Sequence, residues 1–118
     1  LAYLYEPNTA ILKAGGFQSI TKQLTILKLH KHSHLYTSES LVDFPGRSFK
    51  IEKIVPYNKK EIKKLGIKKA NITTRNFPET VQQIREKLNI KDGGNHYLFF
   101  TKDFKDHKIL IISEKINS

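Results

Sequence analysis

The sequence predicts an α+β fold, and three observations support this prediction. Segments with the three- and four-residue apolar spacing of helices alternate with segments whose apolar residues recur at every second position, as in strands. Elements mixed in this way pack their helices on one face of a sheet. With 118 residues and 38% hydrophobic content, the chain is long enough for one core and too short for two ordinary domains. We therefore expect a single domain over residues 1–118, with a helical segment at 1–28 and, over 29–118, a β-α-β-α-β-β mixed sheet that carries its helices on one face.

The N-terminal segment starts with a short strand-like stretch, Tyr3-Leu4-Tyr5, after which Pro7-Asn8 offers a helix start with Asn8 as the capping residue. Apolar residues then recur at helical spacing: Ala10, Ala14, Phe17, Ile20 and Leu24. Gly15-Gly16 interrupts this pattern, because each glycine costs about 1 kcal/mol relative to Ala inside a helix. The sequence therefore predicts a helix that bends or divides at these glycines.

The middle of the chain reads as extended structure. Residues 29–37 have a turn-flanked, extended character, and Phe44-Pro45-Gly46-Arg47 is typical of a tight turn because Pro presets φ and Gly tolerates positive φ. A strand should follow over residues 49–55, with Phe49, Ile51 and Val55 on one face.

The second half alternates between helices and strands. A short helix is expected at residues 59–65, capped by Asn58 and stopped by Gly66, and residues 70–77 return to strand. Pro78 should open a third helix with the apolar stripe Val81, Ile84 and Leu88. The chain ends in a predicted hairpin, with strands at residues 97–102 and 108–113.

Positive charge is the clearest functional signal. The chain has 21 Lys and Arg against 11 Asp and Glu, a net charge of +10, and residues 58–75 supply +6 of it because Glu61 is the only acid there. Such a balance favours a polyanionic partner such as nucleic acid. The predicted RNA-binding residues are Lys59, Lys60, Lys63, Lys64, Lys68, Lys69, Arg75 and Tyr57.

On a helix, the lysines at 59, 60, 63 and 64 share the side opposite Ile62 and Leu65, so they should project together into solvent. Their mutual repulsion costs a few tenths of a kcal/mol per pair, which a bound polyanion would relieve. The plainer interpretation is a solvated helix face with no partner. Tyr57 adjoins this helix and is a candidate for stacking on a base.

Other chemistry finds little support. His30, His32 and His34 alternate as metal ligands on a strand could, but no Cys or carboxylate pattern completes a ligand set, so we expect no metal. Zero Cys fits a reducing compartment, and the cytoplasm is the default expectation. Phosphate-loop, dinucleotide-binding and hydrolase signatures are missing, and no apolar run approaches the ~20 residues of a membrane span.

Several segments together resemble one family. They are Tyr3-Leu4-Tyr5-Glu6-Pro7-Asn8, Ala10-Ile11-Leu12-Lys13-Ala14-Gly15, His34-Leu35-Tyr36-Thr37-Ser38, Phe44-Pro45-Gly46-Arg47, Lys69-Ala70-Asn71-Ile72 and Arg75-Asn76-Phe77-Pro78. Their order and spacing resemble the THUMP-like C-terminal domain of bacterial class I S-adenosylmethionine-dependent methyltransferases, particularly those of Bacteroidetes. The similarity covers nearly the whole chain.

In that family the methyltransferase domain precedes this module and holds S-adenosylmethionine. The resemblance therefore implies a C-terminal fragment of a longer protein, without a catalytic centre or cofactor of its own, and the start at Leu1 without any Met fits this expectation. Kinship with THUMP modules implies that the chain presents RNA, transfer or ribosomal, to the methyltransferase domain of the same protein. Two alternatives stay open: a domain that only docks on and shapes the methyltransferase domain, and a small basic nuclease using His, Lys and Glu.

Overall fold

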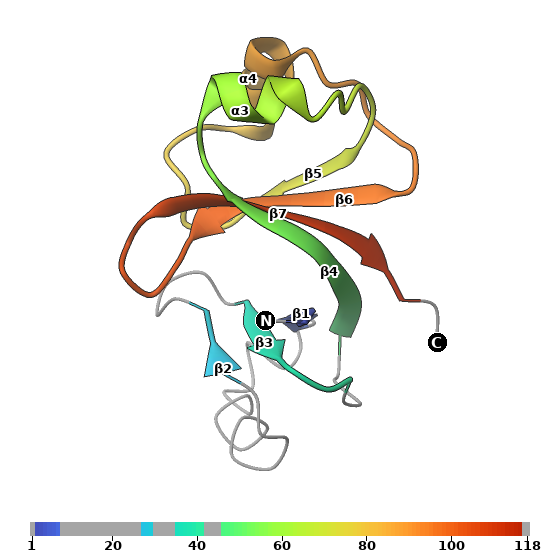
Figure 1. Cartoon of the computed structure of the whole chain (residues 1–118), viewed down its shortest axis with the longest axis vertical. Helices are drawn as coiled ribbons and strands as arrows, with labels where there is room; N and C mark the ends of the chain where they lie inside the picture. The colour runs from blue at the N-terminus through green and yellow to red at the C-terminus, as the bar shows by residue number, and fades with distance from the viewer. Residues whose placement is uncertain (1, 8–26, 30–34, 42–45, 117–118) are drawn as a thin grey trace.

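The computed structural model describes residues 2–7, 27–29, 35–41 and 46–116, and within them the strands form one seven-stranded sheet in the order β2-β3-β1-β4-β7-β6-β5 (Figure 1). The elements are β1 (Tyr3–Pro7), β2 (Leu27–Lys28), β3 (Tyr36–Ser38), β4 (Gly46–Pro56), α3 (Lys59–Lys64), β5 (Asn71–Thr74), α4 (Val81–Leu88), β6 (His96–Lys102) and β7 (Lys108–Lys115). The pairs are antiparallel except β5 with β6, which is parallel, so the predicted mixed sheet is confirmed.

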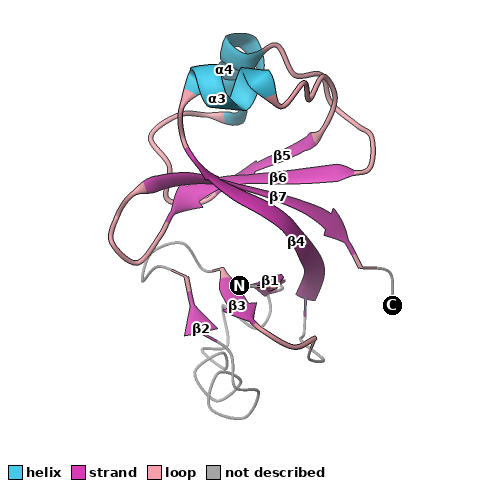
Figure 2. Ribbon diagram, viewed as in Figure 1, coloured by secondary structure: helices cyan, strands magenta, loops and turns pink. Residues whose placement is uncertain are grey.

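The order β4-α3-β5-α4-β6-β7 is the β-α-β-α-β-β succession expected from the sequence. Both helices lie on the same side of the β5-β6-β7 part of the sheet, as Figure 2 shows. The α+β class is therefore confirmed, with its two described helices on one face.

The N-terminal helical segment is the part of the prediction that is wrong. Residues 1–28 begin with β1 and end with β2, and both belong to the sheet. β1 pairs with β4 from Tyr3 opposite Lys50 to Pro7 opposite Gly46, and this pairing buries Leu4 and Tyr5 completely. The pairing joins residues about forty positions apart, which local helical spacing cannot reveal. The predicted helix at residues 8–26 and its glycine pair lie outside the described residues.

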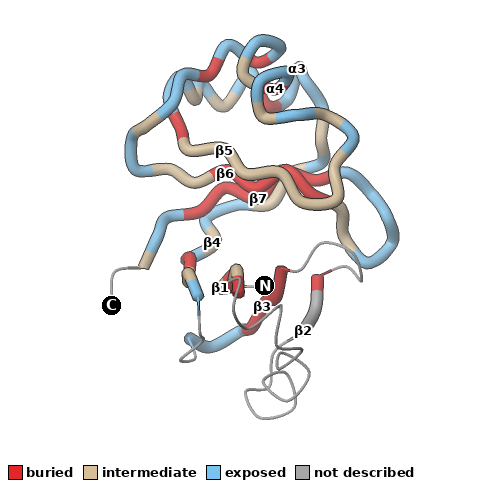
Figure 3. The backbone as a smooth tube through the Cα atoms, turned by 180° about the vertical axis from the view of Figure 1, so that it is seen from behind, coloured by how far each residue is buried: buried red, intermediate tan, exposed pale blue. Residues whose placement is uncertain are grey.

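The core has two parts, one on each face of the sheet (Figure 3). One part lies between the sheet and the two helices, and β6 and β7 contribute to it Leu98, Phe100, Leu110 and Ile112. The alternate residues of the same strands, Phe99, Ile109 and Ile111, belong to the other part. The second part comprises Leu4, Leu29, Leu35, Phe49, Phe99, Ile109 and Ile111. Because both faces are covered, these two strands are apolar at nearly every position rather than at every second one.

A β-bulge in β4 changes which face its side chains take. The register with β7 shifts between Ile51 and Lys53, which leaves Glu52 as an extra residue. Phe49 and Ile51 face the β1 side, but after the bulge Val55 packs against the helix-side core. The prediction that Val55 shares a face with Phe49 and Ile51 is therefore wrong, because one inserted residue reverses the alternation.

Capping residues set the helix boundaries. The side chain of Asn58 accepts hydrogen bonds from the backbone N–H groups of Lys60 and Glu61, as expected from the sequence. The helix α4 starts at Val81 rather than at the expected Pro78, because Thr80 and Gln83 form a reciprocal capping box. It ends at Asn89, which adopts the left-handed conformation.

Candidate nucleic-acid interface

The four lysines of α3 lie on its outer side. Each of these lysines, at positions 59, 60, 63 and 64, is exposed, whereas Ile62 is 2% exposed and packs in the helix-side core. The one ion pair that α3 forms within the described residues is between Lys64 and Glu61, at 3.4 Å, with both side chains mostly exposed. Such an exposed pair contributes little and does not neutralise the cluster. The helix therefore presents its charge outward, as predicted.

Lys68 connects this helix to the lysines that follow it. Lys63 and Lys68 border a groove of about 230 Å³ between α3 and the end of α4, whose wall includes Ile62 and Leu88. Lys68 also borders a second groove of about 380 Å³, together with Lys53 of β4 and Lys69. The two grooves share Lys68 and therefore place four lysines, from β4, α3 and the loop that follows α3, along one stretch of surface.

Lys69 is held in place by the glycines at positions 93 and 94. Its backbone forms a parallel bridge with Lys91, and its aliphatic stem crosses Gly93 so closely that a Cβ there would lie 2.8 Å from Lys69 Cε. Gly93 also has φ +109°, which side-chain-bearing residues rarely adopt. These glycines therefore serve packing, and Lys91 becomes a neighbour of Lys69.

Arg75 lies apart from the lysines. It follows β5 at the end opposite Lys69, and its guanidinium donates to Glu6, which also accepts from Arg47 at 2.7 Å. The Glu6 carboxylate is 12% exposed and the two arginines about 40%. Arg75 is thus engaged in an internal ion pair, although sequence reasoning placed it with the basic cluster.

Tyr57 is occupied by packing. Its ring meets Phe77 and Phe100 edge-on at centroid distances of 5.0 and 5.8 Å, and its hydroxyl donates to Glu79 at 2.8 Å. The ammonium groups of Lys87 and Lys108 lie over the ring, at 5.1 and 5.9 Å from its centroid. Base stacking by Tyr57 remains untested, and the contacts give the ring a structural role.

Electrostatics in this small cluster follow from those contacts. Burial and the hydrogen bond to Glu79 raise the pKa of Tyr57 above its ordinary value of 10.0. Burial by itself raises the pKa of Glu79, but the hydrogen bonds from Tyr57 and Lys87 outweigh it and hold that pKa below 4.5. Hydrogen bonds with Tyr57 and, next in importance, with Glu79 raise the pKa of Lys87.

We call the exposed lysines around α3 and the two grooves the lysine surface. It consists of Lys53, Lys59, Lys60, Lys63, Lys64, Lys68, Lys69 and Lys91. Sequence reasoning missed Lys53 and Lys91. In a regular strand Lys53 would share the face of Phe49 and Ile51, but the bulge turns it to the helix side, where it borders the groove. Lys91 is distant in sequence, and the signal that could have found it is the adjacent Gly93-Gly94, which is typical of a close backbone approach.

The candidate metal ligands at positions 30, 32 and 34 lie outside the described residues, so the structure leaves that prediction untested. Among the residues that the structure describes, no helix has the length and apolar character needed to cross a membrane.

Comparison with known proteins gives three findings. Residues 46–115 match the model of a THUMP domain-like family, and residues 3–45 match that of a ferredoxin-like domain. The crystal structure of a "putative methyltransferase" from Porphyromonas gingivalis W83 matches with a TM-score of 0.89 and 39% sequence identity, over 98% of this chain and 30% of that one. No curated protein matches the chain. This chain therefore corresponds to less than a third of the length of the Porphyromonas protein.

Proposed function

Since the chain belongs to the THUMP domain-like family, we propose that it is a non-catalytic module that binds RNA, transfer or ribosomal, for a methyltransferase domain of the same protein. The observation that carries this proposal is the lysine surface, where eight exposed lysines from β4, α3 and the loops beside α4 and β5 lie together.

Lysines bind phosphates as point charges, and most of the binding free energy comes from the release of counterions. The surface is therefore suited to holding an RNA backbone without reading its bases. If it neutralises three to five phosphates, the logarithm of the affinity falls with the logarithm of salt concentration at a slope of roughly −2 to −4 for a single strand.

The resemblance to the Porphyromonas gingivalis protein supports the second half of the proposal. That protein is described as a "putative methyltransferase" and is more than three times as long as this chain. We infer that the parent protein carries a separate domain that binds S-adenosylmethionine and transfers the methyl group, in the cytoplasm, while this module holds the RNA.

One observation favours a second function, a docking domain that shapes the methyltransferase domain without touching RNA. Phe104 at the tip of the β6–β7 turn is 78% exposed, and Leu41 is 52% exposed. Large apolar side chains that stand in solvent on one domain can pack against another domain. On this alternative, the lysines would serve solubility or face an acidic partner surface.

A matched pair of variants separates the two functions. Lys60, Lys63 and Lys68 form no ion pair within the described residues, so K60Q/K63Q/K68Q should leave the fold intact. The control K50Q/K105Q/K115Q removes the same charge from exposed positions on β4, the β6–β7 turn and β7. RNA-binding function predicts that only the first variant binds structured RNA at least tenfold more weakly. Equal affinities for both variants would favour the docking function instead.

A further inference from the structure

Three metal-ligating side chains meet at one end of the sheet, and two of them border a groove of the lysine surface. Glu52 lies at the bulge of β4, His96 begins β6, and Glu114 lies near the end of β7. His96 and Glu114 are direct cross-strand partners, and therefore point to the same face. That face is the helix side, because Leu98 and Ile112 follow the same alternation into the helix-side core.

The bulge is what brings the third side chain into place. Glu52 has no partner position of its own on β7, since Ile51 pairs with Ser113 and Lys53 with Ile112. Bulges commonly redirect a side chain in this way. The Glu52 carboxylate lies 3.6 Å from His96 Nε2, and one ligand atom from each of the three residues lies within 4.8 Å of the others.

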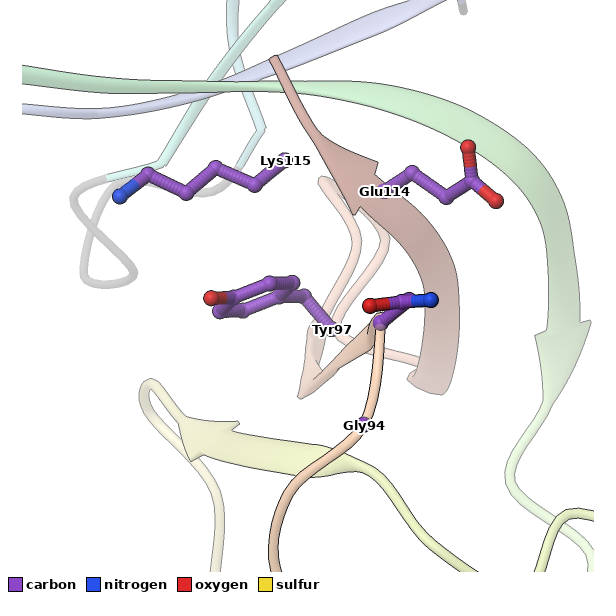
Figure 4. Close-up of a pocket in the computed structure, with 5 residues that line it drawn as sticks. Gly94, Tyr97, Glu114 and Lys115 are labelled. Carbon is purple, nitrogen blue, oxygen red and sulfur yellow. The ribbon is translucent and has the colours of Figure 1, made fainter. Parts of the chain in front are cut away.

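The other face of the same strands is kept apart from this cluster. Figure 4 shows the Lys115 side chain above Tyr97, with the Glu114 carboxylate directed to the opposite side of β7. On the helix side, Lys50 of β4 is the cross-strand partner of Glu114 and therefore shares its face. Lys53, Lys68 and Lys69 line the 380 Å³ groove that Glu52 and His96 also border.

These observations fit a metal ion better than a bare acid cluster. Zinc binds imidazole nitrogen and carboxylate oxygen at about 2.0–2.2 Å, which places neighbouring ligand atoms about 3.4 Å apart in a tetrahedral site. The 3.6 Å between His96 Nε2 and the Glu52 carboxylate is close to that value. The Glu114 carboxylate lies within 4.8 Å of both and is exposed, so a side-chain rotation would be needed to bring it to that distance. An imidazole ligand selects transition metals over Ca²⁺ and Mg²⁺, which prefer oxygen alone.

We propose that Glu52, His96 and Glu114 bind a divalent transition-metal ion, Zn²⁺ in the first place, with its open position toward the groove. Three protein ligands leave the fourth position of a tetrahedral ion for water or another ligand. The lysines that line the groove favour an anion there, such as a phosphate oxygen.

The test is a zinc titration of the whole chain by isothermal calorimetry, without nucleic acid, so that failure of RNA binding cannot affect it. Residues 30, 32 and 34 are histidines that also bind zinc in principle, so each protein carries His30→Asn, His32→Asn and His34→Asn. The site variants are His96→Asn and Glu52→Gln. The matched control is His107→Asn, because His107 Nδ1 lies 3.6 Å from Asp103, the same separation as in the cluster but with one carboxylate.

The proposal predicts one zinc site in the protein that carries only the three changes at positions 30, 32 and 34. Both site variants should weaken this site about 10- to 100-fold or abolish it, and the control variant should leave it unchanged. Circular dichroism confirms the fold of each variant, and Glu52→Gln keeps the size of the side chain in case His96→Asn perturbs the strand. Absence of a zinc site in the protein with only those three changes would overturn the proposal. Equal zinc affinity of that protein and the Glu52→Gln variant would also overturn it. The three residues would then form only an ion pair.

Discussion

Glu6 accepts a hydrogen bond from Arg75, a residue 69 positions later in the chain, while its other carboxylate oxygen accepts from Arg47. Glu6 lies in β1, within the part that matches a ferredoxin-like domain, and both arginines lie in the THUMP-like part. The two matched parts also share one sheet, since β1 pairs with β4 along its whole length. The largely buried Glu6 carboxylate therefore links the two parts in addition to the strand pairing.

We expect Glu6→Gln to lower the free energy of unfolding by about 1–2 kcal/mol, because a charge-assisted pair is lost while the half-exposed arginines can still reach water. Urea denaturation measures this change. The exposed pair of Glu61 with Lys64 supplies the control, and Glu61→Gln should change stability by about 0.5 kcal/mol or less. Equal effects of the two variants would refute the structural role of Glu6.

Stability should depend on pH through the Tyr57, Glu79 and Lys87 cluster. The pKa of Glu79 is lowered, so its contribution is present above about pH 4.5 and is lost as the pH falls below that value. The pKa values of Tyr57 and Lys87 are raised, so their contribution is present below about pH 10 and is lost as the pH rises beyond it. Unfolding curves of wild type and Glu79→Gln should converge as the pH approaches 3. Parallel curves down to that pH would contradict the assignment.

The hydroxyl of Tyr57 gives a test of its structural role. Tyr57→Phe keeps the ring contacts with Phe77 and Phe100 but leaves Glu79 without its hydrogen-bond donor, so we expect a loss of about 1 kcal/mol. RNA affinity should not change, because the phenyl ring stacks as a tyrosine ring does and the ring is already packed. If the folded Tyr57→Phe variant bound RNA more weakly, the hydroxyl of Tyr57 would have to contact RNA.

Gly93 and Gly66 both have positive φ but should respond differently to substitution. Gly66 has φ +70° and open space around it, so Gly66→Ala should lower stability by about 1 kcal/mol. At Gly93, φ is +109° and Lys69 is in the way, so Gly93→Ala should lower it by about 2–3 kcal/mol. Combining Gly93→Ala with Lys69→Ala should restore only part of the loss, because the backbone strain remains. Thermal unfolding followed by circular dichroism gives these values, and full restoration would show that the clash dominates.

Elements governed by local rules could be predicted from the sequence. The helix after Asn58, the two strands of the terminal hairpin and the outward lysines could be predicted from local sequence, and the structure agrees with them. Pairings between distant residues could not be predicted. The strand-like stretch at residues 3–5 was visible in the sequence, but its pairing with β4, about forty positions later, was not, and the strand at residues 27–28 was assigned to the helical segment.

The candidate site shows the same division. The charges of the helix were visible in the sequence, whereas one extra residue, Glu52, decides the orientation of Lys53 and of its own carboxylate. Arg75 belonged to the basic cluster by sequence position, but the fold places it beside Glu6. Charge composition therefore indicated the class of partner, and the tertiary structure decides which residues can meet it.

The central claim is that the lysine surface binds RNA, and the salt dependence of binding tests it most directly. Fluorescence anisotropy would measure the affinity of this chain for single-stranded RNA, structured transfer RNA, a ribosomal RNA fragment and duplex DNA over a series of salt concentrations. We predict that the chain binds RNA in preference to DNA, and that log affinity falls with log salt concentration at a slope of roughly −2 to −4 on a single-stranded probe. The variant K60Q/K63Q/K68Q should make this slope shallower by about 2, whereas K50Q/K105Q/K115Q should leave it unchanged. Weak binding that is indifferent to the type of nucleic acid, or the same slope for both variants, would contradict the account.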